Sequence, residues 1–218
     1  MIVGERYVIM NEVKRQKMFT IISIIILIMS VVVHELAHGF TANAMGDPTA
    51  RLQGRLTLNP ISHIDPVGSI IVPLITSLFG FTFGWAKPVP YNPYNIKNKR
   101  MGEFLIAAAG PGSNLLLALI FGTFIRFTAG IPGFSSFIEI SSYIVIINII
   151  LAIFNLIPLP PLDGSKLLFA ILPNQYGRAR MTLEAYAPFF IIIVVFFLWQ
   201  AIVPIIPFIF GIFTGVSF

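Results

Sequence analysis

Long apolar stretches without a charged residue constrain this chain more than any other feature of its sequence. They cover residues 18–33 with an apolar continuation to about 44, 66–86, 104–125, 140–162 and 185–218. An α-helix needs about 20 apolar residues to cross the hydrocarbon core of a bilayer. We therefore expect a polytopic membrane protein built from helices.

The composition supports this class and excludes several others. Hydrophobic residues make up 56% of the 218 residues and charged residues only 11%, whereas an ordinary soluble domain has about 25% charged residues. The 14 basic and 9 acidic side chains cannot cover the surface of a soluble globule of this size. A soluble enzyme, a disordered tail and a nucleic-acid-binding domain are therefore excluded. The absence of cysteine excludes disulfides and thiolate metal sites.

The two longest polar segments lie between apolar stretches, at about residues 43–66 and 84–102. Both are rich in Pro, Gly and Asn, as loops are. Residues 51–58 alternate polar and apolar side chains, a pattern that predicts a short strand. Neither segment is long enough for a separate soluble domain, so we expect a single integral membrane domain over residues 1–218.

Two histidines and a glutamate stand in the first apolar stretch, where ionisable side chains are costly and usually functional. His34 and His38 are four residues apart, so a helix presents both on one face and both can ligate one metal ion. Glu35 can reach a water at that ion from the side. This His-Glu-x-x-His pattern is typical of zinc metalloproteases, in which the glutamate is the general base. The alternative is a pair of helix-packing histidines with a glutamate that neutralises one of them.

A catalytic zinc site also needs a third protein ligand and an open position for water. The extended form of the motif is absent, because Thr41 and Ala44 occupy the positions of its glycine and third histidine. Asp47 and Asp65 each precede a proline and are typical of turn or cap residues. His63 can be a ligand, a loop hydrogen-bonder or a pH-sensitive surface group. These residues are therefore weak candidates for the third ligand.

Asp163 is the third ligand that we favour. Pro158, Pro160 and Pro161 precede it and break the helix of the fourth apolar stretch. Non-helical backbone at membrane depth is tolerated only where it is buried in protein or lines a wet cavity. A carboxylate beside such a break is well placed to bind a metal. The alternative role for Asp163 is the N-cap of a following helix over residues 164–172.

Together these residues resemble the site-2 protease family, which are intramembrane zinc metalloproteases. The resemblance covers about residues 30–170 and rests on four segments: His34-Glu35-Leu36-Ala37-His38, Phe83 to Pro93, Ala109-Gly110-Pro111-Gly112-Ser113-Asn114, and Asn155 to Gly164. It implies one Zn²⁺ per chain and a short prokaryotic branch without a PDZ domain. One departure is Ser165, where the family often has a second glycine.

The proposed ligands also predict a topology. His34 and His38 lie near the C-terminal end of their helix and Asp163 near the end of its own, so these helices must run in the same direction to share an ion. An odd number of crossings must then separate them, although two apolar stretches lie between. The stretch 66–86 is the weaker helix because it is rich in Gly, Pro and β-branched residues. We predict an all-α polytopic membrane protein with about four transmembrane helices and a re-entrant β-like hydrophobic element between the first and second, as the resemblance also implies.

This topology places the active site toward the cytoplasmic side of a prokaryotic plasma membrane, with the N-terminus outside. It puts 9 basic residues inside and 5 outside, whereas five crossings with a cytoplasmic N-terminus would put 11 inside and 3 outside. The positive-inside rule prefers the second arrangement. We favour the first, because metal ligation is a strict constraint and the charge rule is a bias.

The expected function is zinc-dependent hydrolysis of peptide bonds within or near the transmembrane helices of membrane-protein substrates, with Glu35 as general base. The catalytic core is expected at about residues 19–172, and a C-terminal transmembrane helix, kinked by its prolines, at about 187–213. The alternatives are a membrane metal-ion transporter and a non-catalytic scaffold that binds membrane helices. A single cluster with a glutamate placed as a base favours hydrolysis over transport, and the presence of His34, Glu35, His38 and Asp163 together argues against a non-catalytic scaffold.

Two asparagines and two backbone segments complete the expected site. Asn155 or Asn114 is a candidate oxyanion donor or substrate ligand, and hydrogen bonding between helices is an equal alternative for Asn114. A substrate helix must unwind before cleavage, and a strand edge at residues 51–58 or 68–75 could pair with it.

Overall fold

The computed structural model describes residues 2–78, 84–173 and 176–216, and within these residues the chain is helical without a strand. Its α-helices are α1 (Ile2–Ala44), α2 (Thr49–Leu52), α3 (Val72–Ser77), α4 (Lys99–Thr128), α5 (Ser135–Leu156), α6 (Asp163–Ile171), α7 (Gly177–Ala185), α8 (Ala187–Ile193), α9 (Trp199–Ile202) and α10 (Ile205–Thr214). Short 3₁₀ helices lie at Pro60–His63 and Pro93–Asn95, and π-helical turns at Val67–Ile71 and Val194–Leu198.

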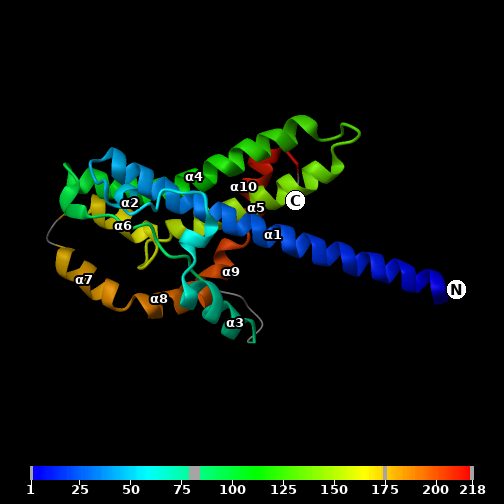
Figure 1. Cartoon of the computed structure of the whole chain (residues 1–218), viewed down its shortest axis with the longest axis horizontal. Helices are drawn as coiled ribbons and strands as arrows, with labels where there is room; N and C mark the ends of the chain where they lie inside the picture. The colour runs from blue at the N-terminus through cyan, green and yellow to red at the C-terminus, as the bar shows by residue number, and fades with distance from the viewer. Residues whose placement is uncertain (1, 79–83, 174–175, 217–218) are drawn as a thin grey trace.

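Three helices in the described part of the chain are long and apolar enough to cross a membrane: Glu12–Ala44 of α1, all of α4 and all of α5. In Figure 1, α1 and α5 run in the same direction and α4 runs opposite to both. One long helix therefore separates the helix of the histidines from the helix that leads to Asp163. This arrangement agrees with the topology that shared ligation requires.

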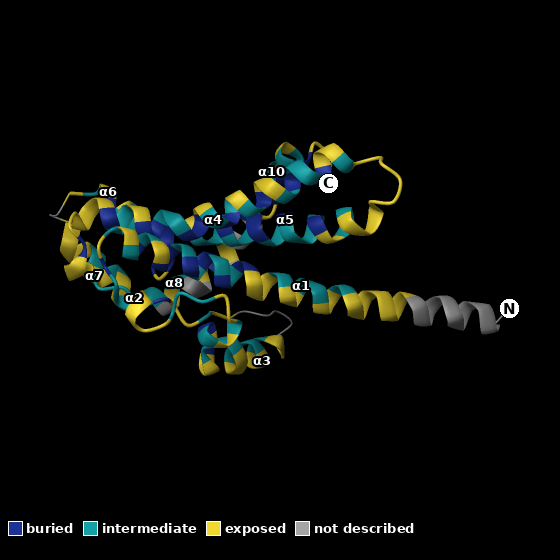
Figure 2. Cartoon of the chain, turned by 45° about the horizontal axis from the view of Figure 1, so that its top comes forward, coloured by how far each residue is buried: buried dark blue, intermediate teal, exposed yellow. Residues whose placement is uncertain are grey.

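The lipid-facing character of the bundle is visible on its surface. The long helices expose large apolar side chains such as Ile24, Ile28, Leu116 and Ile120, and exposed residues line their outer faces in Figure 2. The buried side of α4 is instead rich in Gly and Ala, which lets backbones approach closely as in other membrane bundles. The apolar exterior and small-residue interior are what a bilayer demands.

The region predicted as one C-terminal transmembrane helix over residues 187–213 is divided. The chain passes through α8, a π-helical turn and α9, and then breaks before α10. Pro204 caps the N-terminus of α10 and Pro207 lies inside it, so the predicted kink is a break at these prolines. Ile206 and Phe210 of α10 pack into the core of α4 and α5. A fourth membrane crossing by this region stays a prediction.

The prediction of strands between α1 and α4 is wrong for the described residues. Residues 51–52 belong to α2, residues 53–58 form a turn and irregular backbone, and residues 68–75 are helical. Asp65 Oδ1 accepts a hydrogen bond from Gly68 N at 2.7 Å and starts this helical segment. In the part of the chain that the structure describes, no strand is available to pair with residues 51–58, and a lone strand would leave its backbone groups unpaired.

The apolar helix at Val67–Ser77 is short. Its 11 residues would extend about 16 Å at 1.5 Å per residue, roughly half of a hydrocarbon core of about 30 Å. As a helix it cannot cross the membrane within these residues. Residues 79–83, where the stretch 66–86 would turn back, lie outside the described residues, so the re-entrant path stays a prediction.

Candidate metal centre

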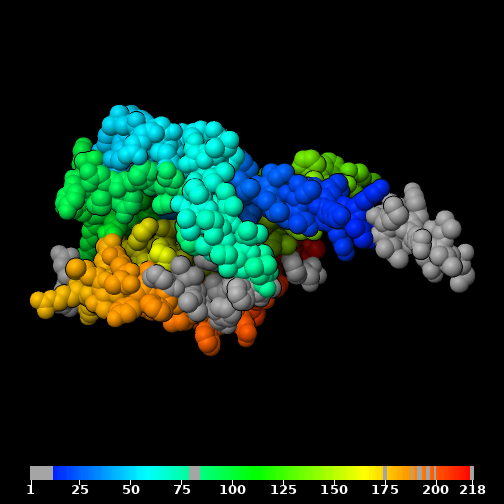
Figure 3. Space-filling model, turned by 60° about the horizontal axis from the view of Figure 1, so that its bottom comes forward, coloured from blue at the N-terminus to red at the C-terminus, as the bar shows by residue number. Residues whose placement is uncertain are grey.

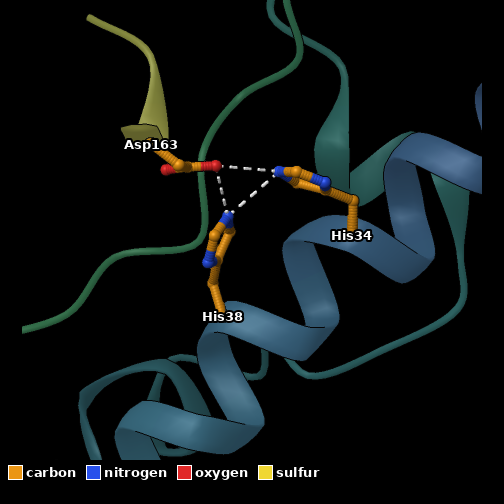
Figure 4. A group of neighbouring side chains, drawn as sticks. All are labelled: His34, His38 and Asp163. Atoms are coloured by element: carbon orange, nitrogen blue, oxygen red, sulfur yellow. Dashed lines mark hydrogen bonds and ion pairs between the residues drawn. The ribbon is translucent and has the colours of Figure 1, made fainter. Parts of the chain in front are cut away.

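Two histidines of α1 and the first residue of α6 converge at one buried point (Figure 4). His34 Nε2 and His38 Nε2 lie 3.0 Å apart, and Asp163 Oδ2 lies 3.1 Å from the first and 3.0 Å from the second. All three side chains are buried. Among the described residues, they form the one group of His, Asp and Glu side chains close enough together to hold a metal ion.

The break after α5 brings Asp163 to this point. Ile157 and Leu162 have extended backbone, since the prolines between them prevent a helix, and α6 begins at Asp163. A Cβ at Gly164 would lie 2.3 Å from the carbonyl oxygen of Leu156, so only glycine lets the first turn of α6 pack so closely on the end of α5. The N-cap position of α6 is occupied by Leu162, and Asp163 is the first residue of the helix. Its carboxylate faces the histidines instead, which disfavours the N-cap alternative.

The hydrogen-bond partners of Nδ1 in the two imidazoles show that this nitrogen carries a proton. His38 Nδ1 is 2.6 Å from the carbonyl oxygen of Ile106, which can only accept, so this nitrogen carries the proton. His34 Nδ1 likewise donates to Asn114 Oδ1 at 2.6 Å. In the neutral form of each imidazole, Nε2 therefore turns a lone pair toward Asp163 Oδ2. Three acceptor atoms that meet in a buried site repel one another unless a cation lies among them.

This donor set fits Zn²⁺. Two neutral imidazoles and one carboxylate are ligands of catalytic zinc sites. In a tetrahedral site with bonds of about 2.0–2.1 Å, ligand atoms lie about 3.3 Å apart, close to the separations of 3.0–3.1 Å between these three atoms. The site therefore needs only a small adjustment to hold the ion.

The backbone of α4 closes one side of the same space at Gly110. A Cβ at this position would lie 2.4 Å from His38 Nε2 and 2.5 Å from His34 Nε2. Any side chain there would enter the space that both ligand nitrogens face. Gly110 thus leaves room for an ion between α1 and α4.

Lys166 holds the second carboxylate oxygen of Asp163. Its Nζ lies 3.2 Å from Asp163 Oδ1. Burial favours the neutral amine, but the nearby Asp163, Tyr91 and Glu35 outweigh it, so the pKa of Lys166 is raised and the side chain stays cationic. Asp163 therefore has one oxygen for Lys166 and one for the histidines.

Glu35 stands apart from the three converging residues. It is half-buried, and its Oε2 accepts a hydrogen bond from Val89 N at 2.9 Å. Val89 belongs to the segment 84–92, which has no regular secondary structure. It is buried, and its side chain packs beside Gly39 of α1. Glu35 is thus anchored by backbone rather than placed among the ligand atoms, which suits a base better than a ligand.

The other acidic and histidine candidates have structural roles. Asp47 is fully buried and accepts hydrogen bonds from Thr49, Asn92 and Asn95. Burial opposes its charge, but these bonds prevail and lower the pKa of Asp47. His63 Nε2 bonds to the carbonyl oxygen of Thr57 at 3.0 Å. Asp47 and His63 thus stabilise loops, and Asp65 stands at the start of a helix. These are the turn, cap and loop roles that the sequence predicted.

The two candidate asparagines differ. Asn155 bonds through Nδ2 to the carbonyl oxygen of Leu151 on its own helix at 2.9 Å. Asn114 is fully buried and uses both ends of its amide, with its oxygen on His34 and its nitrogen on α5. This geometry favours the helix-to-helix role for Asn114 over an oxyanion donor.

Comparison with known proteins identifies related chains. The profile of peptidase family M50 matches residues 22–143 and 132–199. The protein named "Putative zinc metalloprotease YwhC" of Bacillus subtilis is 40% identical over 180 residues, which are 79% of this chain and 78% of the relative. "Putative zinc metalloprotease Rip2" of Mycolicibacterium smegmatis is 31% identical over 178 residues, 80% of this chain and 66% of the relative. "Zinc metalloprotease MJ0392" of Methanocaldococcus jannaschii is 26% identical over 172 residues, 78% of this chain and 40% of that protein. No solved structure is significantly similar.

Proposed function

We propose below which residues of this chain bind zinc and which one moves the proton; the chain itself belongs to peptidase family M50, the site-2 protease family. It is an intramembrane zinc metalloprotease, a membrane protein that hydrolyses peptide bonds of membrane-protein substrates. The family does not by itself say which side chains of this chain bind zinc and which moves the proton.

Our proposal is that His34, His38 and Asp163 bind one Zn²⁺. The observation that carries it is the convergence of two imidazole Nε2 atoms and a carboxylate oxygen at 3.0–3.1 Å, with the Nδ1 atom of each imidazole engaged elsewhere. When both imidazoles are neutral, a metal ion removes the repulsion between these three atoms, and Gly110 leaves space for it.

Glu35 is proposed as the general base. Zinc, when bound, supplies a Lewis acid that acidifies water and polarises the carbonyl of the scissile peptide. Glu35 removes a proton from the attacking water and then delivers it to the leaving amine nitrogen. Its hydrogen bond from Val89 N keeps the carboxylate oriented without neutralising it. Asn155 is retained as a candidate contact for substrate backbone.

We place the site near the cytoplasmic face of the plasma membrane, in a single membrane domain. The uncharged residues 18–33 of α1 extend about 24 Å, so His34 lies deep within a core of about 30 Å but toward its far side. On the face shown in Figure 3, cyan and green segments lie along the upper edge and the orange C-terminal segment along the lower edge, a teal segment crosses between them, and yellow atoms of the α5–α6 region are visible beside it. A substrate helix would reach the site between such segments.

The test compares the wild type with Glu35→Gln. Both purified proteins are analysed for zinc and incubated with a single-span membrane peptide in proteoliposomes. We expect both to hold about one zinc per chain and the variant to cleave roughly 10²–10⁴-fold more slowly. Leu52→Gln, an exposed change in α2, is the control for handling. A variant that cleaves like the wild type would refute the role of Glu35, and one that loses its zinc would point to a ligand or transport role instead.

A further inference from the structure

A chain of buried amides leads from the metal centre into the middle of the helix bundle. Asn114 Nδ2 lies 2.8 Å from Asn148 Oδ1 and 3.4 Å from the carbonyl oxygen of Ser30. Asn148 Nδ2 lies 2.9 Å from Ser30 Oγ and 2.9 Å from the carbonyl oxygen of Ile144. Asn114 and Asn148 are fully buried, and Ser30 is 4% exposed. Helices α1, α4 and α5 thus each contribute one polar side chain to a single network.

The direction of each hydrogen bond in this network is set by the carbonyl group of Ile144, at the end away from the metal centre. The carbonyl oxygen of Ile144 can only accept, so Asn148 turns its amide nitrogen toward it and its oxygen toward α4. That oxygen also only accepts, so Asn114 must present its nitrogen to Asn148 and its oxygen to His34. His34 must then donate, which places its proton on Nδ1. The position of the lone pair of neutral His34 is therefore set by groups on α4 and α5.

The second histidine needs no such network. His38 Nδ1 donates directly to the carbonyl oxygen of Ile106 in α4, and no side-chain substitution removes that carbonyl. The proton position of His34 depends instead on side chains that can be replaced. If Asn114 turned its amide over, its nitrogen would face Nδ1 and favour a proton on Nε2, which would then point at Asp163 and His38 and could not bind a metal.

We propose that Asn148, supported by Ser30, is a positioning residue that holds the proton of His34 on Nδ1 by orienting Asn114, and so raises the zinc affinity of the site. The proposal rests on the proposed function in that His34 is a zinc ligand. Groups that orient a metal-binding histidine through its other nitrogen typically change metal affinity 10–100-fold when they are mutated. Polar side chains in membrane helices need a partner, and here the partners form an ordered path to the metal centre.

The first arm of the test measures zinc affinity of the purified full chain by competition with a chelator. Asn148→Leu removes the acceptor for Asn114 at similar volume and is expected to weaken zinc binding about 10–100-fold. Asn148→Asp keeps an oxygen acceptor for Asn114 in either protonation state and should restore most of the affinity. Ser141→Ala is the matched control, because Ser141 is buried on the same face of α5 two turns earlier and its hydroxyl has no hydrogen-bond partner among the described residues. It should bind zinc like the wild type.

The second arm reads the proton position by ¹⁵N NMR of zinc-free protein with labelled histidine. The chain has only 3 histidines, so the spectrum can be assigned by single substitution. We expect His34 to carry its proton on Nδ1 in the wild type and to gain the Nε2-protonated form in Asn148→Leu. A wild-type His34 protonated on Nε2 overturns the proposal even if the variant does not fold, as does an Asn148→Leu protein that binds zinc like the wild type. Failure of the wild type to bind zinc would instead overturn the proposed function.

Discussion

At the scale of single residues, the metal centre depends on one glycine as much as on its three ligand side chains. Gly110 of α4 faces the Nε2 atoms of His34 and His38, and the space beyond its Cα is the space that an ion needs. Gly112, two residues further along the same helix, has nothing within 4 Å of the corresponding position. The two glycines therefore provide a matched pair for testing where the ion lies.

We expect Gly110→Ala to abolish stoichiometric zinc binding without removing a ligand, because its methyl group would lie within 2.6 Å of the imidazole atoms. Gly112→Ala should bind zinc normally, and both changes replace glycine by a better helix former. Zinc content of the purified proteins is the measurement. Full occupancy in Gly110→Ala would mean that the ion does not lie between α1 and α4.

Lys166 supports a second residue-scale prediction. Replacing it by Met keeps most of the unbranched side chain and removes the ammonium group from Asp163 Oδ1, so Asp163 can turn away from the histidines. We expect zinc affinity to fall about tenfold in a chelator competition, with partial rescue by Lys166→Arg. Lys87→Met, at an exposed position, is the control. An unchanged affinity in Lys166→Met would show that the ion pair does not orient the ligand.

The sequence identified the converging residues but not their surroundings. His34 and His38 could be predicted because helical spacing is local, and Asp163 because the prolines before it mark a break in a membrane helix. The roles of Gly110 and Asn148 could not, because they depend on the rotation of α4 and α5 against α1. An asparagine in the Ile-rich run of α5 was nevertheless a signal, since a buried amide in a membrane helix needs a partner.

At the scale of elements, α6 positions Asp163 and is itself held at its other end. Arg100, in the first turn of α4, donates from Nε to the carbonyl oxygen of Ala170 and from Nη2 to those of Ile171 and Leu172. These are the carbonyl groups that the end of a helix leaves without partners. One guanidinium group therefore caps the short helix that begins with a metal-centre residue.

We expect Arg100→Leu to lower the hydrogen-exchange protection of α6 amides about tenfold, the equivalent of one hydrogen bond to a charged group. Arg100→Lys should not restore it, because a single ammonium group cannot bridge three carbonyls. Arg178→Leu, at an exposed position of α7, serves as the control. Equal protection of α6 in Arg100→Leu and the wild type would show that the cap is dispensable.

The elements that hydrophobicity alone determines were predicted correctly from the sequence. The element that would need a partner strand was not. The long helices α1, α4 and α5 follow from apolar length alone. The strand at residues 51–58 was wrong, since alternation in a short segment indicates a strand only if a partner strand is available. In the structure, Arg55 of this segment bonds to the carbonyl oxygens of Lys87 and Pro88 through its side chain, so the contact exists without a ladder.

At the scale of the whole molecule, the arrangement of α1, α4 and α5 fixes which ends lie on the same side of the membrane. The turn between α4 and α5 lies at the end of the bundle from which α1 enters, away from α2 and α6 (Figure 1). Ligation of one ion by His34, His38 and Asp163 requires an odd number of crossings between their helices, and α4 runs opposite to both α1 and α5. The orientation of the bundle, with the end at α2 and α6 toward the cytoplasm, is a separate prediction.

That sidedness can be measured with single cysteines, because the chain has none of its own. Ile131→Cys lies in the α4–α5 turn and Gln53→Cys after α2, both at exposed positions. In intact cells, a membrane-impermeant maleimide should label Ile131→Cys, whereas Gln53→Cys should react only after lysis. The reverse pattern would place the active site on the outer side, and labelling of both positions in intact cells would instead indicate the arrangement with five crossings that the positive-inside rule prefers.

The most direct test of the account is anomalous X-ray scattering at the zinc edge from crystals of the zinc-loaded protein. We predict one strong peak per chain, about 2.0–2.2 Å from His34 Nε2, His38 Nε2 and an oxygen of Asp163. A peak at any other place, or a structure in which Asp163 turns away from both imidazoles, would contradict the assignment of these three residues as the zinc ligands.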